Sequence, residues 1–136
     1  MEAKDSADSV VIVVTDKDKI LLIKRSKTDT WMPNHWSFPG GHIEKKESKY
    51  NAAKRELKEE TQLDGKPVLR GSRATKNGKM FIFVCEDWSG EIKLNYEHSE
   101  SMWIKYDDIS DLKDKTPFVK EIVATALKIP LGYVWT

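Results

Sequence analysis

The chain has 136 residues, of which 39% are hydrophobic and 33% are charged. This length is enough for one hydrophobic core and short for two ordinary domains, so we expect a single domain over residues 1–136. The 23 basic and 22 acidic side chains nearly cancel, which argues against binding to a nucleic-acid duplex or to an anionic membrane. A small polyanionic substrate is compatible with these numbers, because local charge can differ from the sum.

The terminus and the cysteine content indicate the compartment. The N-terminal stretch MEAKDSADS is polar and lacks the apolar segment of a signal peptide, and the longest aliphatic run, VVIVV, is too short to cross a bilayer. The single cysteine, Cys85, lies in the apolar run MFIFVCE, which indicates a buried strand thiol and excludes a disulfide framework. We therefore expect a cytoplasmic protein.

Two strands open the predicted fold. Residues 10–15 are β-branched and apolar, residues 20–24 are apolar again, and the turn DKDK lies between them, so a hairpin is expected. Residues 31–41, WMPNHWSFPGG, hold two prolines, two adjacent glycines and three aromatic side chains. This composition predicts a loop after the hairpin.

A helix is predicted over residues 48–61, which contain good helix formers and no Gly or Pro. Tyr50, Ala53 and Leu57 fall at i, i+3 and i+7 and predict its buried stripe. Beyond it, strands are predicted at residues 68–75 and 80–86, on either side of KNGK, whose Asn-Gly pair is typical of a hairpin turn.

The C-terminal part predicts two further short strands, at residues 92–94 and 102–106. A last helix is predicted over residues 118–128, with Thr116 as its cap and Pro117 in its first turn. The order of these elements, β-β-loop-α-β-β-β-β-α, indicates an α/β fold in which a mixed sheet lies between helices.

Three glutamates crowd the end of the first predicted helix: Glu56, Glu59 and Glu60. At about 100° per residue they occupy roughly a quarter turn beside the buried stripe. Their mutual repulsion and their position near the helix C-terminus both disfavour the helix, which indicates a site. Converging carboxylates suit Mg²⁺ or Mn²⁺ bound together with a substrate phosphate. A solvated face with an Arg55–Glu59 pair is the alternative, and the charge pattern alone leaves both interpretations open.

The complete spacing around these glutamates resembles a known signature. Gly41, Glu47, the run RELKEE at residues 55–60 and Leu63 match eight of the nine fixed positions of the Nudix hydrolase box, and Gln62 stands where that family has glycine. The resemblance extends to FPGG and ILLIKR before the box and to EHSESMWIKYDDI after it. It therefore covers most of the chain.

This resemblance implies a Nudix-type α/β/α sandwich and the hydrolysis of a nucleoside diphosphate linked to another group, by attack of metal-activated water on phosphorus. It implies that Mg²⁺ or Mn²⁺ is bound by the carboxylates of Glu56, Glu59 and Glu60 and by the carbonyl oxygen of Gly40. Glu56 is also the group expected to orient or deprotonate the water. Arg55 is expected to position the glutamates, with Glu47 as its partner.

A later loop, NYEHSESMW, offers a further acidic group. Glu97 is favoured over Glu100 as an extra metal ligand or alternative base, and two solvated loop glutamates are the alternative. The three histidines, His35, His42 and His98, lack ligand spacing and are expected to be solvated or hydrogen-bonded.

Four other side chains are candidates for contacts with substrate. Arg25 ends the second strand, where the family often has a basic residue near the substrate phosphates, and a plain exposed arginine is the alternative. Trp36 and Phe38 precede PGG and could stack on a base or belong to the core, and Trp31 is similarly undecided.

The expected substrate is a small nucleotide and is narrowed by elimination. About fifteen residues past the box, the family's proline of ADP-ribose hydrolases and tyrosine of dinucleoside polyphosphate hydrolases are missing, because Gly78-Lys79-Met80-Phe81 stands there. The resemblance thus favours a nucleoside triphosphate pyrophosphohydrolase that releases a monophosphate and pyrophosphate. ADP-ribose, nucleotide sugars, dinucleoside polyphosphates and a non-catalytic nucleotide-binding module stay open. A monomer or a homodimer is expected.

Overall fold

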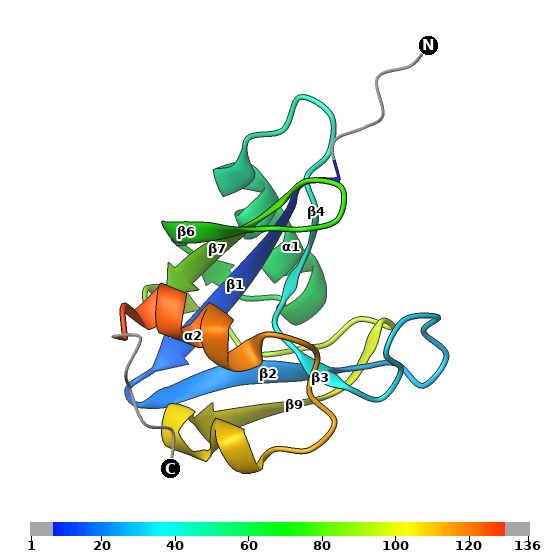
Figure 1. The fold of residues 1–136 in the computed structure, drawn as a ribbon, viewed down its shortest axis with the longest axis vertical. Coiled ribbons are helices and arrows are strands. Elements are labelled where there is room, and N and C mark those ends of the chain that lie inside the picture. The colour runs from blue at the N-terminus through cyan, green and yellow to red at the C-terminus, as the bar shows by residue number, and fades with distance from the viewer. Residues whose placement is uncertain (1–6, 130–136) are drawn as a thin grey trace.

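The computed structural model describes residues 7–129 and places one helix on each face of a mixed sheet. Helix α1 (Lys49–Thr61) lies behind the sheet in Figure 1 and helix α2 (Val119–Leu127) lies in front of it. None of the helices within residues 7–129 is long and apolar enough to span a membrane. The predicted α/β/α sandwich is confirmed.

Seven strands form the main sheet, in the order β3-β2-β1-β7-β6, with β4 also paired to β1 and β9 to β2. Their bounds are Ser9–Asp16 (β1), Lys19–Arg25 (β2), Trp36–Ser37 (β3), Gly40–His42 (β4), Val68–Ala74 (β6), Lys79–Cys85 (β7) and His98–Lys105 (β9). Strand β1 pairs in parallel with β7 and antiparallel with β2 and β4, so the sheet is mixed. A separate pair, β5 (Asp64–Gly65) with β8 (Trp88–Ser89), and a 3-10 helix η1 (Tyr106–Asp111) complete the described elements.

Two hydrophobic cores lie on the two faces of the sheet, because alternate residues of a strand point to opposite sides. Along β1, Ile12 and Val14 pack in the core beneath α1, and Val13 packs in the core beneath α2. Strand β7 divides in the same way, with Phe83 on the α1 side and Val84 on the α2 side. Strands that are buried on both faces of a sheet therefore have nearly continuous apolar sequences, as observed here.

Helix α1 begins and ends with identifiable caps. The Ser48 hydroxyl oxygen accepts a hydrogen bond from the Asn51 N–H at 3.1 Å. The helix ends at Gln62, whose left-handed φ of 66° replaces the usual glycine. The prediction that Tyr50 belongs to the buried stripe is wrong, because this ring lies in the first turn and is 41% exposed at the rim of a surface groove.

Two predicted segments, a loop and a strand, differ from the structure. Residues 31–41 are not loop alone, since β3 and β4 lie within them and pair with β2 and β1. The strand predicted at residues 92–94 is wrong, because Ile92 and Leu94 pack against the core beneath α1 without a strand partner. Lys93 instead donates its backbone N–H to the carbonyl of Thr61 at 2.9 Å.

Helix α2 starts later than predicted. Its N-cap is Phe118, which has a left-handed φ of 67°, so Pro117 precedes the helix instead of occupying its first turn. The strand predicted at residues 102–106 is present but begins earlier, at His98. This cap matters for the site, because the Phe118 residue is 53% exposed.

Candidate active site

The acidic edge of α1 lies against strand β4. The Glu60 carboxylate is almost fully buried, and its Oε1 accepts a hydrogen bond from the Gly40 N–H at 2.8 Å. The Glu56 carboxylate lies next to Gly41, where an added Cβ would come within 2.5 Å of Oε1. Any side chain at position 41 would displace this carboxylate. The close contact with Glu56 therefore explains why position 41 is a glycine. Glu59 lies further out, with its side chain 54% exposed.

Arg55 connects the glutamates of this edge. Its guanidinium donates two hydrogen bonds to the Glu47 carboxylate, from Nε to Oε2 at 2.7 Å and from Nη2 to Oε1 at 3.0 Å. Nη1 donates to Glu56 at 2.9 Å and to Glu59 at 3.3 Å, and Nη2 also donates to the His42 carbonyl at 3.0 Å. Such a fork cannot be reproduced by lysine. The predicted pairing of Arg55 with Glu47 is present, and so is the Arg55–Glu59 pair that belonged to the alternative of a solvated helix face.

The electrostatics of the cluster follow from burial and from the neighbouring charges. Burial raises the pKa of Glu60 to about 8; the charges of Glu56 and Glu97 act in the same direction, and the Gly40 hydrogen bond opposes them. Burial also raises the pKa of Glu56, against the effect of Arg55. The hydrogen bonds from Arg55 hold the pKa of Glu47 below its usual range. The two inner carboxylates are therefore short of positive charge, whereas Glu47 is compensated.

The donor set fits a divalent cation in its chemistry. Glu60 is a buried carboxylate without an ion pair among the described residues, and hard oxygen donors of this kind suit Mg²⁺ or Mn²⁺. In the observed conformations, no three Asp, Glu, His or Cys side chains within residues 7–129 surround one point closely enough to hold a metal. Glu59 in particular is turned toward Arg55. Binding an ion would therefore draw the carboxylates together.

The later loop brings one glutamate toward this edge and not the other. The negative charge of Glu97 raises the pKa of both Glu56 and Glu60. Glu100 instead forms an ion pair with Lys24 of the neighbouring strand at 3.3 Å. The side chain favoured by the sequence is thus the one that lies near the cluster.

His98 differs from the expectation of a solvated or hydrogen-bonded histidine. Its residue is buried, and its Nδ1 has no hydrogen-bond partner in the described part of the chain. Burial, assisted by the charge of Arg25, lowers the pKa of His98 to about 4. His98 pairs with Arg25 across β2 and β9, and no local sequence signal indicates its burial.

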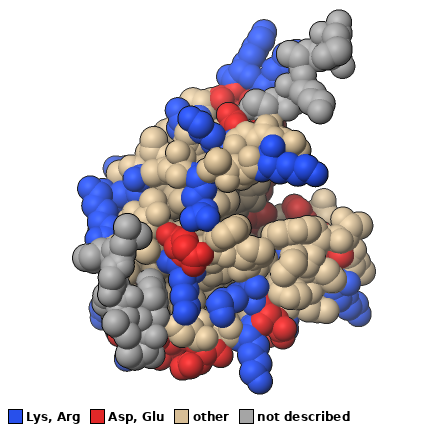
Figure 2. Space-filling model, viewed as in Figure 1, with Lys and Arg blue, Asp and Glu red and all other residues tan. Residues whose placement is uncertain are grey.

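A cavity of about 670 Å³ opens beside the acidic edge. Gly40 and Gly41, the two glycines in contact with Glu60 and Glu56, form part of its wall. Figure 2 shows a hollow on the right of the molecule with acidic atoms deep inside it. We call this space the substrate cavity; its apolar and aromatic lining comprises Val10, Val11, Trp31, Phe38, Met80, Phe118 and Ile122.

The predicted substrate contacts are only partly gathered at this cavity. Phe38 and Arg25 line it, as does Trp31, whereas Trp36 does not and instead carries the Lys24 ammonium group 5.6 Å from its ring centre. Phe118 was missed, because it comes from the start of α2, far away in the sequence.

Arg25 is already compensated within its own loop. Its Nη2 lies 2.7 Å from the Asp29 carboxylate, and its Nε donates to the Trp31 carbonyl at 2.8 Å. The guanidinium also lies 4.8 Å from the centre of the Trp31 ring. A hydrogen bond from the Trp31 backbone, together with Arg25, holds the pKa of Asp29 below its usual range. Arg25 therefore anchors Trp31 at the cavity wall.

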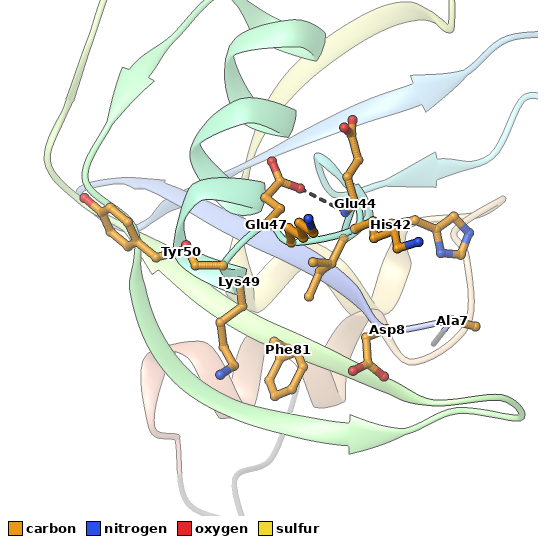
Figure 3. A pocket seen from close by; sticks show the side chains of 12 residues that line it. Ala7, Asp8, His42, Glu44, Glu47, Lys49, Tyr50 and Phe81 are labelled. Atoms are coloured by element: carbon orange, nitrogen blue, oxygen red, sulfur yellow. Dashed lines mark hydrogen bonds between the residues drawn. The ribbon is translucent and has the colours of Figure 1, made fainter. Parts of the chain in front are cut away.

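A larger surface groove, of about 1050 Å³, lies at the start of α1 (Figure 3). Asp8, Glu47, Lys49, Tyr50 and Phe81 are among its lining residues, and the Lys49 ammonium lies 4.9 Å from the centre of the Phe81 ring. None of the three α1 glutamates at residues 56, 59 and 60 lines this groove. The groove is therefore separate from the acidic edge.

Known proteins are similar to this chain in sequence. RNA pyrophosphohydrolase of Pelagibacter ubique is 30% identical over 149 residues, which cover 85% of this chain and 92% of that protein. The m7GpppN-mRNA hydrolase NUDT17 of Xenopus laevis is 47% identical over 53 residues, which cover 39% of this chain, and the match spans only 18% of that relative's length.

The fold and the family follow from two further matches. The crystal structure of a MutT NUDIX hydrolase from Burkholderia pseudomallei superposes with a TM-score of 0.77 at 20% identity, covering 90% of this chain and 98% of that one. A family model described as the NUDIX domain matches residues 5–126. The chain therefore belongs to the Nudix family.

Proposed function

We propose that the protein hydrolyses a nucleoside triphosphate to a nucleoside monophosphate and pyrophosphate, with Mg²⁺ or Mn²⁺ as cofactor. The observation that carries this proposal is the meeting of the acidic edge of α1 with the substrate cavity at Gly40 and Gly41. One nucleotide can then hold its phosphates at the glutamates while its base lies among the aromatic side chains.

The ligands proposed for the metal are the carboxylates of Glu56, Glu59, Glu60 and Glu97 and the carbonyl of Gly40. When bound, a divalent cation neutralises phosphate oxygens and lowers the pKa of the attacking water. Glu56 orients this water or accepts its proton, and cleavage of the α–β anhydride releases pyrophosphate. Arg55 acts as a positioning residue, because it holds Glu56 at 2.9 Å while Glu47 fixes its fork.

The proposed nucleoside contacts are Phe38, Trp31 and Arg25. Phe38 is buried at the base of the substrate cavity, and Trp31 is 52% exposed on its wall, where a base can reach the free ring face. Arg25 supports Trp31 in addition to any contact with phosphate. Trp36 is not retained in this role, since it does not line the cavity.

A second candidate substrate is the 5′-triphosphate end of an RNA strand. Two relatives are named for RNA, one as an m7GpppN-mRNA hydrolase and one as an RNA pyrophosphohydrolase, and the second aligns over 85% of this chain. The reaction at the glutamates would be the same, so the two candidates differ only in the group attached to the 3′ side of the nucleoside. A binding module without turnover is disfavoured, because every glutamate of the box is present.

The proposal is tested by incubating the protein with ribo- and deoxynucleoside triphosphates, ADP-ribose, a nucleotide sugar, a dinucleoside tetraphosphate and a 5′-triphosphorylated RNA. Products are separated by chromatography, with Mg²⁺ and in excess chelator. We expect monophosphate and pyrophosphate from the triphosphates, only with metal and faster at alkaline pH. Undiminished turnover in chelator would contradict the metal-dependent mechanism, and a strong preference for ADP-ribose would contradict the proposed substrate.

A further inference from the structure

The substrate cavity has an uneven distribution of charge. Three cationic side chains line it, those of Arg25, Arg73 and Lys76. No Asp or Glu is among its lining residues, and the acidic edge borders it only through Gly40 and Gly41. Arg25 is compensated by Asp29 at 2.7 Å. Arg73 and Lys76 have no ion pair within residues 7–129, and Figure 2 shows basic side chains on the upper rim of the hollow. The end of the cavity near β6 therefore carries uncompensated positive charge.

Arg73 is held in one orientation by an aromatic partner. Its guanidinium lies 4.2 Å from the centre of the Phe118 ring, and the left-handed backbone of Phe118 presents that ring to the cavity. Stacking uses the face of the guanidinium and leaves the N–H donors at its edge free. A pre-oriented guanidinium with free donors is the arrangement that binds phosphate with the most geometric specificity.

The sheet register places these cations far from the glutamates. His42, Ser9, Met80 and Arg73 are successive neighbours across β4, β1, β7 and β6, and all four line the cavity. Three strand spacings of about 4.8 Å separate the two ends of this row by roughly 14 Å. The β4 end carries the glycines that contact the glutamates. The β6 end thus faces the nucleoside side of a bound nucleotide and not its reacting phosphates.

We propose that Arg73 and Lys76 bind a second phosphate group, carried on the ribose of the substrate. Bases are uncharged near neutral pH, so a ribose hydroxyl is the position at which the nucleoside side carries an anion. This inference rests on the proposed function and keeps its reaction unchanged. The preferred substrate is then a 5′-triphosphorylated nucleotide with a 3′-phosphate, either as a terminal monoester or as the link to the next nucleotide of a single strand.

The test measures equilibrium binding without turnover. The probes are guanosine 5′-monophosphate, guanosine 3′,5′-bisphosphate and the dinucleotide pGpG, followed by tryptophan fluorescence, since Trp31 lines the cavity. We expect at least one of the 3′-phosphorylated probes to bind about tenfold more tightly than the monophosphate, the effect of one charge-assisted hydrogen bond. Tighter binding of the bisphosphate would show that a terminal 3′-phosphate is sufficient for recognition. Tighter binding of pGpG alone would show that the site recognises a 3′-phosphate that links two nucleotides of a strand.

Matched variants distinguish specific binding at Arg73 and Lys76 from nonspecific attraction of phosphate to positive charge. Arg73→Met and Lys76→Met should each lower the preference for the 3′-phosphorylated probe over the monophosphate from about tenfold to about threefold or less. Lys79→Met should keep the tenfold preference. Lys79 is exposed on the same hairpin and does not line the cavity. Thermal unfolding checks each variant, and the exposed Lys76 provides the test if Arg73→Met does not fold.

The outcomes distinguish this inference from the proposed function. Equal binding of all three probes, or an equal loss of the preference in Lys79→Met and Arg73→Met, would overturn the second phosphate site even if triphosphates are hydrolysed. A preserved tenfold preference in a protein that hydrolyses no nucleotide would support the site and contradict the proposed reaction.

Discussion

Helices α1 and α2 cover opposite faces of one sheet, but they contribute to the site in different ways. Helix α1 supplies Arg55 and the acidic edge, and their partner Glu47 lies just before the helix. Apart from Glu97, the proposed reactive groups therefore come from one continuous stretch of sequence. Helix α2 supplies Phe118 and Ile122, which reach the substrate cavity only beside residues of β1, β6 and β7. The chemistry is thus encoded locally, whereas the shape of the substrate cavity depends on distant segments.

The largest expected effect lies on the α1 side. Glu56→Gln should lower kcat by about 10³, the scale for loss of a general base. The midpoint of thermal unfolding should stay near that of the wild type, because one of several repelling carboxylates is removed. Steady-state kinetics in Mg²⁺ measure this, with Glu121→Gln on α2 as the matched control. Wild-type kcat in Glu56→Gln would place this glutamate outside the reaction.

The second prediction concerns the guanidinium that organises the edge. Arg55→Lys keeps the charge but loses the paired hydrogen bonds to Glu47, so Glu56 is no longer held in place. We expect kcat to fall by about 10- to 100-fold with a smaller change in KM, as for a displaced catalytic group. Arg70→Lys on β6, outside the lining of the cavity, is the control. A change in KM alone would show that Arg55 binds substrate instead of positioning Glu56.

The third prediction is a pH dependence of stability. The folded-state pKa of Glu60, about 8, exceeds the ordinary value of 4.5. Its contribution to the free energy of unfolding is therefore complete below pH 4.5 and is lost as the pH rises toward 8. Relative to Glu60→Gln, metal-free wild-type protein should lose up to a few kcal/mol over this interval.

Urea unfolding in excess chelator, at several pH values between about 5 and 9, measures this difference. The Glu121→Gln variant should follow the wild type throughout. Parallel curves for wild type and Glu60→Gln would show that the buried carboxylate does not titrate as described. Saturating Mg²⁺ should restore stability most at the alkaline end, because the cation binds the ionised carboxylate.

The smallest effects are expected at the ends of the two helices. Gln62 and Lys128 both terminate a helix with left-handed backbone, at φ of 66° and 57°. Gln62→Gly and Lys128→Gly should each raise the free energy of unfolding by up to about 1 kcal/mol, since glycine adopts this conformation without a Cβ penalty. Thermal unfolding measures the gain, and kcat should stay within a few-fold. If Gln62→Gly activated an otherwise inert protein, the proposed enzyme function would be wrong.

The fold was predictable where local signals coincide. Helix α1 carries a Ser48 cap, a run of helix formers and a terminal residue that takes the place of glycine, and its observed bounds differ from the prediction by one residue. The apolar strands of the sheet were found for the same reason. Tyr50 and residues 92–94 were misplaced, because exposure in a first turn and the lack of a strand partner depend on the neighbouring elements.

The site divides in the same way. The grouping of Glu47 with Arg55 is implied by the resemblance to the Nudix box, and the structure brings them within 3.0 Å. The wall formed by Phe118 and Arg73 joins residues 45 positions apart in the sequence, and it depends on a left-handed residue that replaces the expected proline start of α2. Backbone strain of this kind leaves little trace in a sequence pattern, since phenylalanine seldom adopts it.

Binding of a divalent cation to the acidic edge of α1 is tested most directly by titrating the protein with Mn²⁺ and following the free ion by electron paramagnetic resonance. The wild type and Glu121→Gln should bind Mn²⁺ alike. The double variant Glu56→Gln/Glu60→Gln should bind at least about tenfold more weakly, because two hard oxygen ligands lose their charge. Equal Mn²⁺ affinity in the wild type and the double variant would contradict the assignment of this edge as the metal site.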